Sequence, residues 1–502
     1  MTARFDTPEA AAAWLRKHVR GSLLTDSRKL SAGDGFIAWP GAATDGRHFV
    51  AGALATGANA CLVEADGVSG FGFQDARVAT YAGLKAASGP IAAAYFESPS
   101  RYLDVVAVTG TNGKTSTTWF LAQALGRLGR RCGVVGTLGI GEPGAMVSTG
   151  LTTPDPVLLQ SQLRRLVDEG FAACALEASS IGIVEGRLGA MDFDVAVFLN
   201  FTQDHLDFHG SMQAYWEAKK SLFDWPRLKA AVINIDDPKG VELNAALADS
   251  DLDVWTFSCE PSPTMARLQA RGLTYGDGTL NFDVVEGTQV FRIATSMVGK
   301  YNVSNLLAAM ASMRAMNLSL EDIVAACVDL EPVPGRMDAV SVDGLPMVVV
   351  DYAHTPDALE KVLTALRPVA QSRGGQLWCV FGCGGDRDRA KRPLMAAMVE
   401  KYADNIVVTS DNPRTEDPLV IIDDVLNGLK RRDVAQIEVN RAVAISSSLN
   451  QARPQDVVLL AGKGHEQFQE INGVKLPFSD RAHAQAALNA RTTAVRAGSS
   501  LP

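Results

Sequence analysis

The sequence predicts an α/β protein of three units, the second and third of which each contain a mainly parallel sheet. Short apolar runs repeatedly end in polar or glycine-rich loops and alternate with helical patterns, as elements of parallel sheets do. With 502 residues, the chain is too long for a single hydrophobic core. Residues 332–335 are predicted to be a linker, after which the pattern starts again. We therefore expect units at residues 1–100, 101–335 and 336–502.

Composition excludes several classes of protein. The net charge is −9 and no basic tract offsets it, which argues against a nucleic-acid partner. Seven scattered cysteines show neither disulfide nor zinc spacing and fit a reducing cytosol. The charged N-terminus lacks a secretory apolar region, and no apolar run approaches the length of a membrane span. We expect a cytoplasmic protein that contacts no membrane.

The first unit is predicted to begin with a helix over residues 8–18. Thr7 is its expected cap, and Pro8 occupies the first helical position. Short strands are expected at 35–39 and 60–63. The turn at residues 26–28 and the polar loop at 41–47 lie between these elements, and composition alone favours plain connections there.

The central unit opens with a strand at 105–108, a glycine-rich loop and a helix that stops at Gly129. Glycines let backbone N–H groups surround phosphate oxygens at the positive end of a helix. Lys114 would reach the terminal phosphates, and the Thr115 hydroxyl would take a Mg²⁺ position. Val108 replaces the first glycine of the standard P-loop, so a simple packing turn is the alternative. The flanking strand and helix favour a nucleoside triphosphate.

Further strands of this unit are expected at 172–176, 195–199 and 230–233, each ending in a polar cluster. Ligands gather at the carboxyl ends of parallel strands, so these clusters are expected at the same edge as the glycine-rich loop. Residues 250–297 contain alternating short strands, such as 289–293, and predict an antiparallel extension.

Glu177 and His205 end two of these strands, and Lys219 lies in a helical pattern over residues 215–223. A carboxylate and an imidazole near a phosphate site can hold Mg²⁺ between the nucleotide and a second oxyanion. The alternatives stay open at this point, because a lone loop histidine is commonly a surface residue and adjacent lysines commonly form a solvated helix face.

The third unit repeats the strand–loop pattern, with strands expected at 347–350, 377–381, 406–409 and 457–460. By the same edge rule, Arg387, Arg414 and Glu466 should converge. Arginines bind carboxylates in bidentate fashion, and a glutamate accepts from an ammonium group, so the set fits a zwitterionic amino acid. The alternative is that the arginines form ion pairs within their own turns, at 386–388 and 414–416.

Ten motifs along nearly the whole chain resemble those of the Mur ligases of peptidoglycan synthesis. They are, in order, TGTNGKTST, EASS, DHLDFHG, YWEAKKSLF, GKYNVSNLLAA, PGRM, DYAHTPDAL, GCGGDRD, SDNPRTEDP and AGKGHE. The resemblance implies a small UDP-binding α/β domain, a central P-loop ATPase domain and a C-terminal Rossmann-like domain that binds an amino acid. It also implies ATP-dependent amide formation through an acyl phosphate. The DNPR sequence at 411–414 is the family's marker for meso-2,6-diaminopimelate, which would be added to the D-glutamate of UDP-N-acetylmuramoyl-L-alanyl-D-glutamate.

The resemblance also implies roles for individual residues. Those expected to bind ATP are Gly110, Thr111, Asn112, Gly113, Lys114, Thr115, Ser116, Asn302, Arg336 and Asp351. The expected Mg²⁺ ligands are Thr115, Glu177, His205 and Lys219, the last as a carbamate, and the expected catalytic residues are Lys114, Lys219 and His205. Those expected at the UDP-sugar dipeptide are Ser27 with the 42–44 loop, Thr152, Thr153, Ser179, Glu185 and Arg187. Those expected at diaminopimelate are Arg387, Asp411, Asn412, Pro413, Arg414, Gly462 and Glu466.

Three positions depart from the family pattern. Ile181 replaces a common histidine, Glu185 a common glutamine, and Leu151 an asparagine, so contacts there are expected through the backbone or not at all. Two other functions fit the same motifs. One is a related ligase for a different amino acid, such as a folylpolyglutamate synthase, and the other is an ATP-switched binding protein that ligates nothing. We expect small-molecule partners only, and a monomer.

Overall fold

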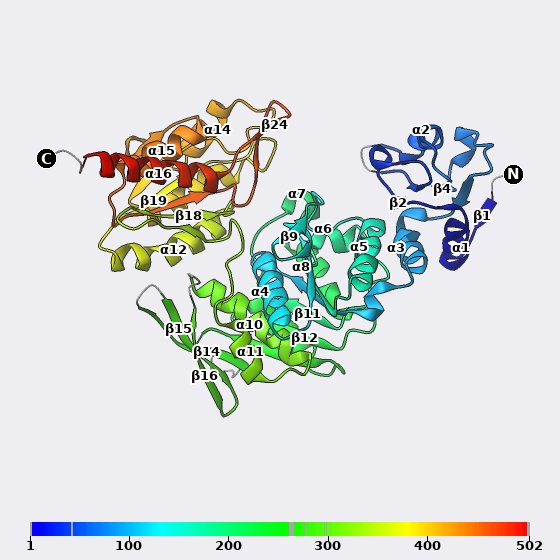
Figure 1. Cartoon of the computed structure of the whole chain (residues 1–502), viewed down its shortest axis with the longest axis horizontal. Helices are drawn as coiled ribbons and strands as arrows, with labels where there is room; N and C mark the ends of the chain where they lie inside the picture. The colour runs from blue at the N-terminus through cyan, green and yellow to red at the C-terminus, as the bar shows by residue number, and fades with distance from the viewer. Residues whose placement is uncertain are drawn as a thin grey trace. The chain divides into compact units, whose positions relative to one another are not determined.

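The structure is a computed structural model that describes residues 3–41, 44–260, 266–276, 279–295, 297 and 299–498. These residues form sheets of five, eleven and six strands and one two-stranded hairpin. Figure 1 shows how the chain runs through them from the N-terminus to the C-terminus. The chain divides into two compact units. The first comprises residues 1–269, 285–291 and 306–327, and the second comprises 270–284, 292–305 and 328–502. The α/β class is confirmed, whereas the boundaries expected at residues 100 and 335 stay a prediction.

The N-terminal sheet is parallel throughout, in the order β1-β5-β4-β3-β2. Its elements are β1 Ala3–Phe5, α1 Pro8–His18, β2 Leu23–Leu24, β3 Gly35–Ala38, α2 Val50–Thr56, β4 Ala60–Glu64, β5 Val78–Tyr81 and α3 Leu84–Tyr95. The predicted start of α1 is confirmed, because the Thr7 side chain accepts from the Ala10 N–H and Pro8 is the first helical residue. Apolar clusters cover both faces of the sheet.

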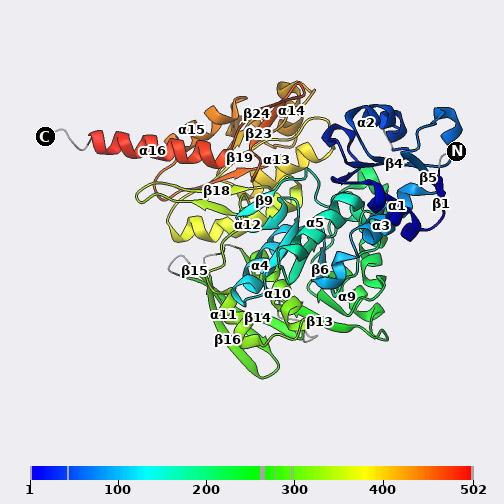
Figure 2. The ribbon, with the colours of Figure 1, turned by 45° about the vertical axis from the view of Figure 1, so that its right-hand side comes forward.

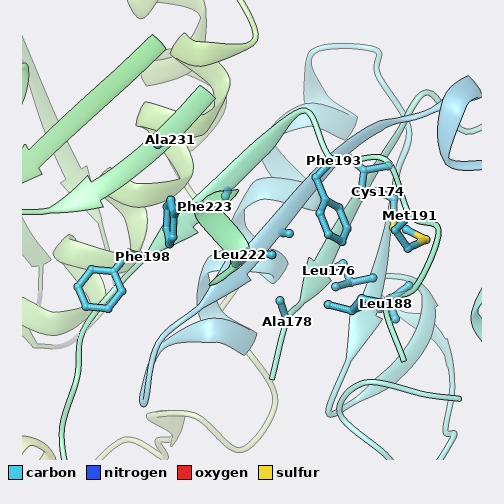
Figure 3. Packing of buried hydrophobic residues seen from close by; sticks show 14 of the residues in the cluster. Cys174, Leu176, Ala178, Leu188, Met191, Phe193, Phe198, Leu222, Phe223 and Ala231 are labelled. Atoms are coloured by element: carbon cyan, nitrogen blue, oxygen red, sulfur yellow. The ribbon is translucent and has the colours of Figure 1, made fainter. Parts of the chain in front are cut away.

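The large sheet is centred on β6, Asp104–Thr109, which pairs in parallel with β10 on one side and β11 on the other. Elements around it are α4 Lys114–Arg127, β7 Cys132–Gly136, β8 Gly139–Glu142, β9 Ala145–Val147, α5 Pro156–Asp168, β10 Ala173–Glu177, α6 Ser180–Val184, β11 Val195–Phe198, α7 Leu206–His209, α8 Met212–Lys220, β12 Ala230–Asn234, α9 Pro238–Ala246 and β13 Asp253–Ser258. Buried Leu176, Phe193 and Leu222 pack in one core cluster on this sheet (Figure 3). Strand β6 therefore delivers its loop to the middle of the carboxyl edge.

One part of the expected antiparallel extension is wrong. Strand β13 pairs in parallel with β12, and the start of β14, Leu268–Gly276, pairs in parallel with β13. The reason is that α9 makes the crossover that parallel strands require. Strands β15, Thr279–Glu286, and β16, Gln289–Thr295, are neighbours joined by a two-residue turn, which only an antiparallel pair allows. Helices α10, Lys300–Ala315, and α11, Leu320–Cys327, follow.

The C-terminal sheet has the order β17-β18-β22-β19-β20-β21 and is parallel except for β17. Its elements are β17 Asp338–Val340, β18 Met347–Asp351, α12 Pro356–Ser372, β19 Leu377–Phe381, α13 Lys391–Tyr402, β20 Asn405–Val408, α14 Pro418–Leu426, β21 Ala435–Ile437, α15 Arg441–Gln451, β22 Val457–Ala461, the hairpin β23 Phe468–Ile471 and β24 Val474–Pro477, and α16 Asp480–Gly498. Helices α12, α13 and α14 pack in one core cluster, and α15 and α16 in another (Figure 2). This is the predicted doubly wound arrangement.

Among the residues that the structure describes, no helix combines enough length with enough apolar character to cross a bilayer.

Candidate active site

The glycine-rich loop after β6 is shaped by contacts with the end of β11. Gly110 and Gly113 have φ angles of 153° and 89°, which favour glycine. A Cβ atom on Gly110 would lie 2.9 Å from the Leu199 Cβ atom. The Asn112 N–H donates to Asn200 Oδ1 at 2.8 Å, and Asn200 Nδ2 donates back to the Asn112 carbonyl at 3.0 Å. The Asn200 side chain therefore fixes the loop that precedes α4, and Leu199 leaves room only for glycine at position 110.

Two lysines donate to one carbonyl oxygen of this loop. Lys114 Nζ lies 2.8 Å and Lys219 Nζ 2.9 Å from the Gly110 oxygen. Lys219 is 1% exposed, and its ammonium lies 4.5 Å from the centre of the Tyr215 ring. Burial, and then the positive charge of Lys114, holds the pKa of Lys219 well below its ordinary value. A solvated helix face is therefore the wrong interpretation of Lys219.

Glu177 ends β10 and is buried beside the turn after β7. Its Oε1 atom accepts from the Thr137 N–H at 2.8 Å, and its Oε2 atom accepts from the Thr137 hydroxyl at 3.2 Å. Thr137 Oγ1 also lies 3.0 Å from Thr152 Oγ1. A Cβ atom on Gly136 would lie 2.1 Å from Glu177 Oε1, so only glycine leaves room for the carboxylate. Thr137 orients this carboxylate, and the sequence interpretation did not include it.

Four residues expected at the UDP-sugar dipeptide surround the same strand end. The Thr153 hydroxyl lies 2.8 Å from the Glu177 carbonyl oxygen and 2.8 Å from Ser179 Oγ. Arg187 donates to the Thr153 carbonyl at 3.0 Å, and Thr152 contacts Thr137 as described. The structure thus brings Thr152, Thr153, Ser179 and Arg187 together with Glu177.

The three departures from the family pattern have different surroundings. Glu185 forms an ion pair with Lys85, at 2.8 Å between Oε2 and Nζ. Leu151 is exposed, and Ile181 is half-buried in α6. Glu185 therefore already has a cationic partner within the protein, which distinguishes it from the neutral glutamine of the family pattern.

His205 lies on the loop after β11 and has a left-handed backbone, with φ of 52°. Its Nε2 atom is 3.5 Å from Asp204 Oδ2. The pKa of His205 is lowered, first by burial and further by the positive charges of Lys114 and Lys219. A lowered pKa keeps the imidazole neutral at pH 7, the form that binds metals and accepts protons.

Several neighbours of these residues were absent from the predicted site. Tyr215 joins the loop through its hydroxyl, 3.2 Å from Thr111 Oγ1. His209 stacks near the Tyr215 ring, at 5.0 Å between centroids, and its Nε2 atom lies 2.9 Å from Ser180 Oγ. Tyr215 belongs to the motif YWEAKKSLF and His209 to the motif DHLDFHG. Membership of these motifs is the feature of the sequence that could have identified both residues.

The donor set expected for Mg²⁺ has suitable chemistry. Thr115, the second residue of α4, is buried, and its hydroxyl would join the carboxylate of Glu177 and the imidazole of His205 as a ligand. Mg²⁺ prefers oxygen ligands. The protein supplies only a few of them, because the ion keeps several waters and binds substrate phosphates. No group of three or more His, Cys, Asp and Glu side chains suited to a metal occurs among the residues that the structure describes. The four expected Mg²⁺ ligands include only two such side chains, Glu177 and His205.

In the second unit, the loops after β19, β20 and β22 converge as predicted. A Cβ atom on Gly384 would lie 3.0 Å from Arg414 NH1 and 3.7 Å from Arg387 Cγ. A Cβ atom on Gly462 would lie 2.5 Å from Asp411 Oδ2. These distances bring the expected diaminopimelate residues to one edge of the sheet.

The two arginines of this edge do not form the ion pairs of the alternative interpretation. Arg414 donates to the Gly385 carbonyl at 2.6 Å, and Arg387 donates to the Asp386 carbonyl at 2.9 Å. Glu416, the carboxylate expected beside Arg414, instead binds the buried Arg392 at 2.7 Å. Arg414 pairs instead with the Glu470 carboxylate, at 3.6 Å from Nε.

The backbone of Arg414 is clamped by the β23–β24 hairpin. Its N–H donates to the Glu470 carbonyl at 3.0 Å, and its own carbonyl accepts from the Asn472 N–H at 2.6 Å. Arg414 has a φ of 52°, a left-handed conformation that these two bonds hold. Asn412 and Glu466 are joined by a hydrogen bond of 2.8 Å from Nδ2 to Oε2.

Two of the residues expected near the adenosine half of ATP, Arg336 and Asp351, lie around β18. The Arg336 guanidinium lies 4.5 Å from the Tyr352 ring centre, and the Tyr352 and His465 rings are 5.4 Å apart. The Asp351 carboxylate accepts from the Met337 and Ala353 N–H groups at 2.8 Å each, while burial raises its pKa. Tyr352 and His465 were not predicted as site residues. Asn302, which was predicted, is buried in α10.

Ser27 begins a short 3₁₀ helix in the N-terminal sheet domain and is half-buried. Its neighbours Asp26 and Arg28 form an ion pair at 2.8 Å. Ala42 and Ala43, of the loop expected beside Ser27, lie outside the described residues, while Thr44 is exposed.

A nucleotide-type loop with two lysines, a buried carboxylate at the end of the neighbouring strand, and a loop cluster with arginines suit an ATP-dependent ligase. The Mur ligase middle domain matches residues 108–313, the Mur ligase glutamate ligase domain matches 335–464, and the Mur ligase catalytic domain matches 22–87. The chain belongs to the Mur ligase family.

Within this family, the chain is similar to ligases that share one name. The chain is 53% identical, over 97% of its length and 98% of the relative, to UDP-N-acetylmuramoyl-L-alanyl-D-glutamate–2,6-diaminopimelate ligase of Acidovorax sp. (strain JS42). It is 47% identical, over 95% of its length and 96% of the relative, to the ligase of the same name from Janthinobacterium sp. (strain Marseille). A solved structure of a ligase with that name is 36% identical, with a TM-score of 0.64, and the match covers 94% of this chain and 95% of the other.

Proposed function

We propose that this chain adds meso-2,6-diaminopimelate to UDP-N-acetylmuramoyl-L-alanyl-D-glutamate in an ATP-dependent reaction. The observation that carries the proposal is the convergence of Arg387, Arg414 and Glu466 at one sheet edge. Two cations and an anion suit an amino acid that bears a second, distal carboxylate. Near-full-length relatives named for this reaction support the same assignment.

ATP would bind with its phosphates on the loop from Gly110 to Ser116. Helix α4 begins at Lys114, directly after Gly113, so its N-terminus follows the loop and suits phosphate oxygens. Lys114 would exchange its hydrogen bonds with the Gly110 and Thr111 carbonyls for the terminal phosphates. Asn302, Arg336 and Asp351 would bind the adenosine half.

The reaction would proceed in two displacements. The γ-carboxylate oxygen of D-glutamate attacks the γ-phosphorus of ATP, an O–P bond forms, and the bond to ADP breaks. The free amine of diaminopimelate then attacks the acyl carbon, a C–N bond forms, phosphate leaves and the amine loses a proton. The first step brings two anions together, so its barrier is mainly electrostatic and Lys114 lowers it. His205, whose pKa is lowered first by burial, would offer a neutral imidazole nitrogen at this centre.

Thr115, Glu177 and His205 would hold Mg²⁺, together with a carbamate on Lys219. When bound, Mg²⁺ would neutralise charge on the phosphate oxygens. Lys219 suits carbamate formation because burial lowers its pKa and so favours the neutral amine that this reaction needs. The neutral amine nitrogen forms a bond to the carbon of carbon dioxide and releases one proton, so the neutral amine becomes an anionic carbamate.

Recognition of the UDP-sugar dipeptide is proposed for the residues around β10. Thr152, Thr153, Ser179 and Arg187 already share one hydrogen-bonded group and would bind the muramoyl dipeptide. Ser27 would bind the uridine end. Because Glu185 is paired with Lys85, we expect it to contribute less than Arg187. We further propose a cytoplasmic monomer, consistent with seven cysteines that all remain free thiols.

The test is an ADP-release assay with purified protein. ADP should appear only when the UDP-muramoyl dipeptide and an amino acid are both present, and diaminopimelate should be the best amino acid in a panel. ADP release without either substrate would favour an ATP-switched protein. Preference for glutamate would favour a folylpolyglutamate-type ligase.

A further inference from the structure

A buried lysine in the second unit has no part in the proposed function so far. Lys463 follows β22 and is 0% exposed. Its Nζ atom donates to Asn412 Oδ1 at 2.9 Å and to Glu466 Oε2 at 2.8 Å. Both partners are residues proposed to bind the amino-acid substrate. A fully buried ammonium is costly unless its partners are well placed, so this contact calls for a reason.

The contacts of Lys463 determine which way the Asn412 amide points. Its Oδ1 atom accepts from Lys463 Nζ and also from the Glu470 N–H, at 3.0 Å. An ammonium and a backbone N–H can only donate, so chemistry alone assigns the amide oxygen to this side. The amide nitrogen, on the other side, donates to Glu466 Oε2 at 2.8 Å.

This orientation limits what Asn412 can offer a ligand. A carbonyl oxygen has two lone pairs, and Lys463 and Glu470 use both. The amide nitrogen has two hydrogens, of which Glu466 takes one. The remaining N–H is a donor, and a donor suits a carboxylate rather than an ammonium.

The same lysine sets the direction of the Glu466 carboxylate. The hydrogen bonds from Lys463 and from Asn412 both fall on Oε2. Oε1 is therefore the oxygen that an ammonium would meet. The charge of Glu466 is balanced before a substrate arrives, so a neutral zwitterion needs no further counter-ion to bind.

We propose that Lys463 is a positioning residue of the amino-acid site. It makes Asn412 a hydrogen-bond donor for a carboxylate of the substrate and directs Oε1 of Glu466 toward its ammonium. This inference rests on the proposed function, because the amino acid is the ligand that would bear both groups.

The experiment uses Lys463→Met, which keeps the length of the side chain and removes its donors. Steady-state ADP release is measured against diaminopimelate, ATP and the UDP-muramoyl dipeptide in turn, and with L-lysine in place of diaminopimelate. We expect KM for diaminopimelate to rise about ten- to a hundredfold, since hydrogen bonds to charged groups are lost. KM for ATP and for the UDP-sugar should hold, and the preference for diaminopimelate over lysine should fall.

The matched control is Lys475→Met on the adjacent hairpin. Lys475 and Lys463 both lie over the Phe468 ring, at 4.3 and 5.7 Å from its centre, so the control removes a lysine from the same ring. Its KM for diaminopimelate should equal that of the wild type. An unchanged KM in Lys463→Met, or an equal rise for all three substrates, overturns the inference.

A second variant covers the case in which Lys463→Met does not fold. The double variant Lys463→Met with Glu466→Gln leaves no buried charge unpaired and is compared with Glu466→Gln alone. Its KM for diaminopimelate should exceed that of Glu466→Gln, because Asn412 loses the contact that orients it, and equal KM values in these two variants would overturn the inference. The two proposals can fail separately. A wild type with no diaminopimelate-dependent ADP release rejects the proposed function and this inference together, whereas an active wild type with unaffected variants rejects this inference alone.

Discussion

Lys114 and Lys219 share one acceptor, the carbonyl oxygen of Gly110, at 2.8 and 2.9 Å. Burial, and then the positive charge of Lys114, lowers the pKa of Lys219, which favours the neutral form of this amine. The shared acceptor thus joins two lysines with different roles. Lys114 would bind the phosphates, and Lys219 would be the amine that is modified.

Lys219→Ala should abolish ligation while the protein stays folded. The physical reason is loss of the amine that would carry the carbamate, and a small added carboxylate should restore part of the activity. ADP release, with circular dichroism for the fold, measures both. The control is Lys220→Ala, at the half-buried neighbour in α8. Full turnover in the Lys219 variant would remove this residue from the mechanism.

The phase of helix α8 could have shown that Lys219 is buried. It lies four residues after Tyr215 and three after Trp216, both of which are buried, so all three share one helix face. Lys220 is the next residue and therefore lies about 100° further around the helix, away from the centre of that face. The sequence therefore carried the distinction between the two lysines, although composition alone suggested that both were solvated.

Strand ends were predictable, while contacts between strands were not. The ends of β10 and β11 placed Glu177 and His205 at the correct edge from the sequence alone. Thr137 was missed because β7 was not predicted as a strand. Its parallel pairing with β10, in which Val135 faces Leu176, brings Thr137 to Glu177. The pairing register of β7 with β10 cannot be predicted from the local sequence of either strand.

His465 gives a prediction about pH. Burial, and then the charge of Arg336, lowers its pKa to about 4 from an ordinary 6.5. Between these values the unfolded chain binds more protons than the folded protein, so stability is lost as the pH falls. His465→Gln should remove this loss, which amounts to up to about 3 kcal/mol by pH 4. Urea titrations from pH 7 to pH 4 test it, with exposed His48→Gln as the control; parallel curves for wild type and His465→Gln would contradict it.

The buried pair of Arg441 and Asp480 should be a large contributor to the stability of the second unit. Both side chains are 0% exposed, and Arg441 also donates to the Ala461 carbonyl at 2.9 Å, just before Gly462. Asp480→Asn should lower the free energy of unfolding by about 3–5 kcal/mol, because it leaves a buried charge unpaired. Asp423→Asn, which breaks the exposed pair with Arg432, should cost about 1 kcal/mol or less. Equal losses in urea titrations would reject the distinction.

Substrate choice follows from the same edge of the second sheet. L-lysine lacks the distal carboxylate of diaminopimelate, so Arg414 would be left without its partner. We expect kcat/KM for diaminopimelate to exceed that for lysine by at least about a hundredfold. The measurement is ADP release with each amino acid at several concentrations. Equal values for the two amino acids would reject the assignment of the DNPR loop.

Arg414 itself allows the sharpest test of the amino-acid site. Its guanidinium should bind the distal carboxylate through two parallel hydrogen bonds, which a lysine ammonium cannot copy. Arg414→Lys should therefore still weaken binding. Arg414→Ala should cost about 2–5 kcal/mol, or roughly a thirtyfold to several-thousandfold loss of affinity for diaminopimelate.

The design of this last test separates binding from folding. Arg414 is held by backbone bonds to the β23–β24 hairpin, and these bonds survive a side-chain change. The affinities for ATP and for the UDP-sugar should therefore hardly move in Arg414→Ala. Isothermal titration of each ligand measures this, with Arg389→Ala, a partly exposed arginine paired with Asp424, as the control. If ATP affinity falls as far as amino-acid affinity, then Arg414 supports the fold and the substrate carboxylate binds elsewhere.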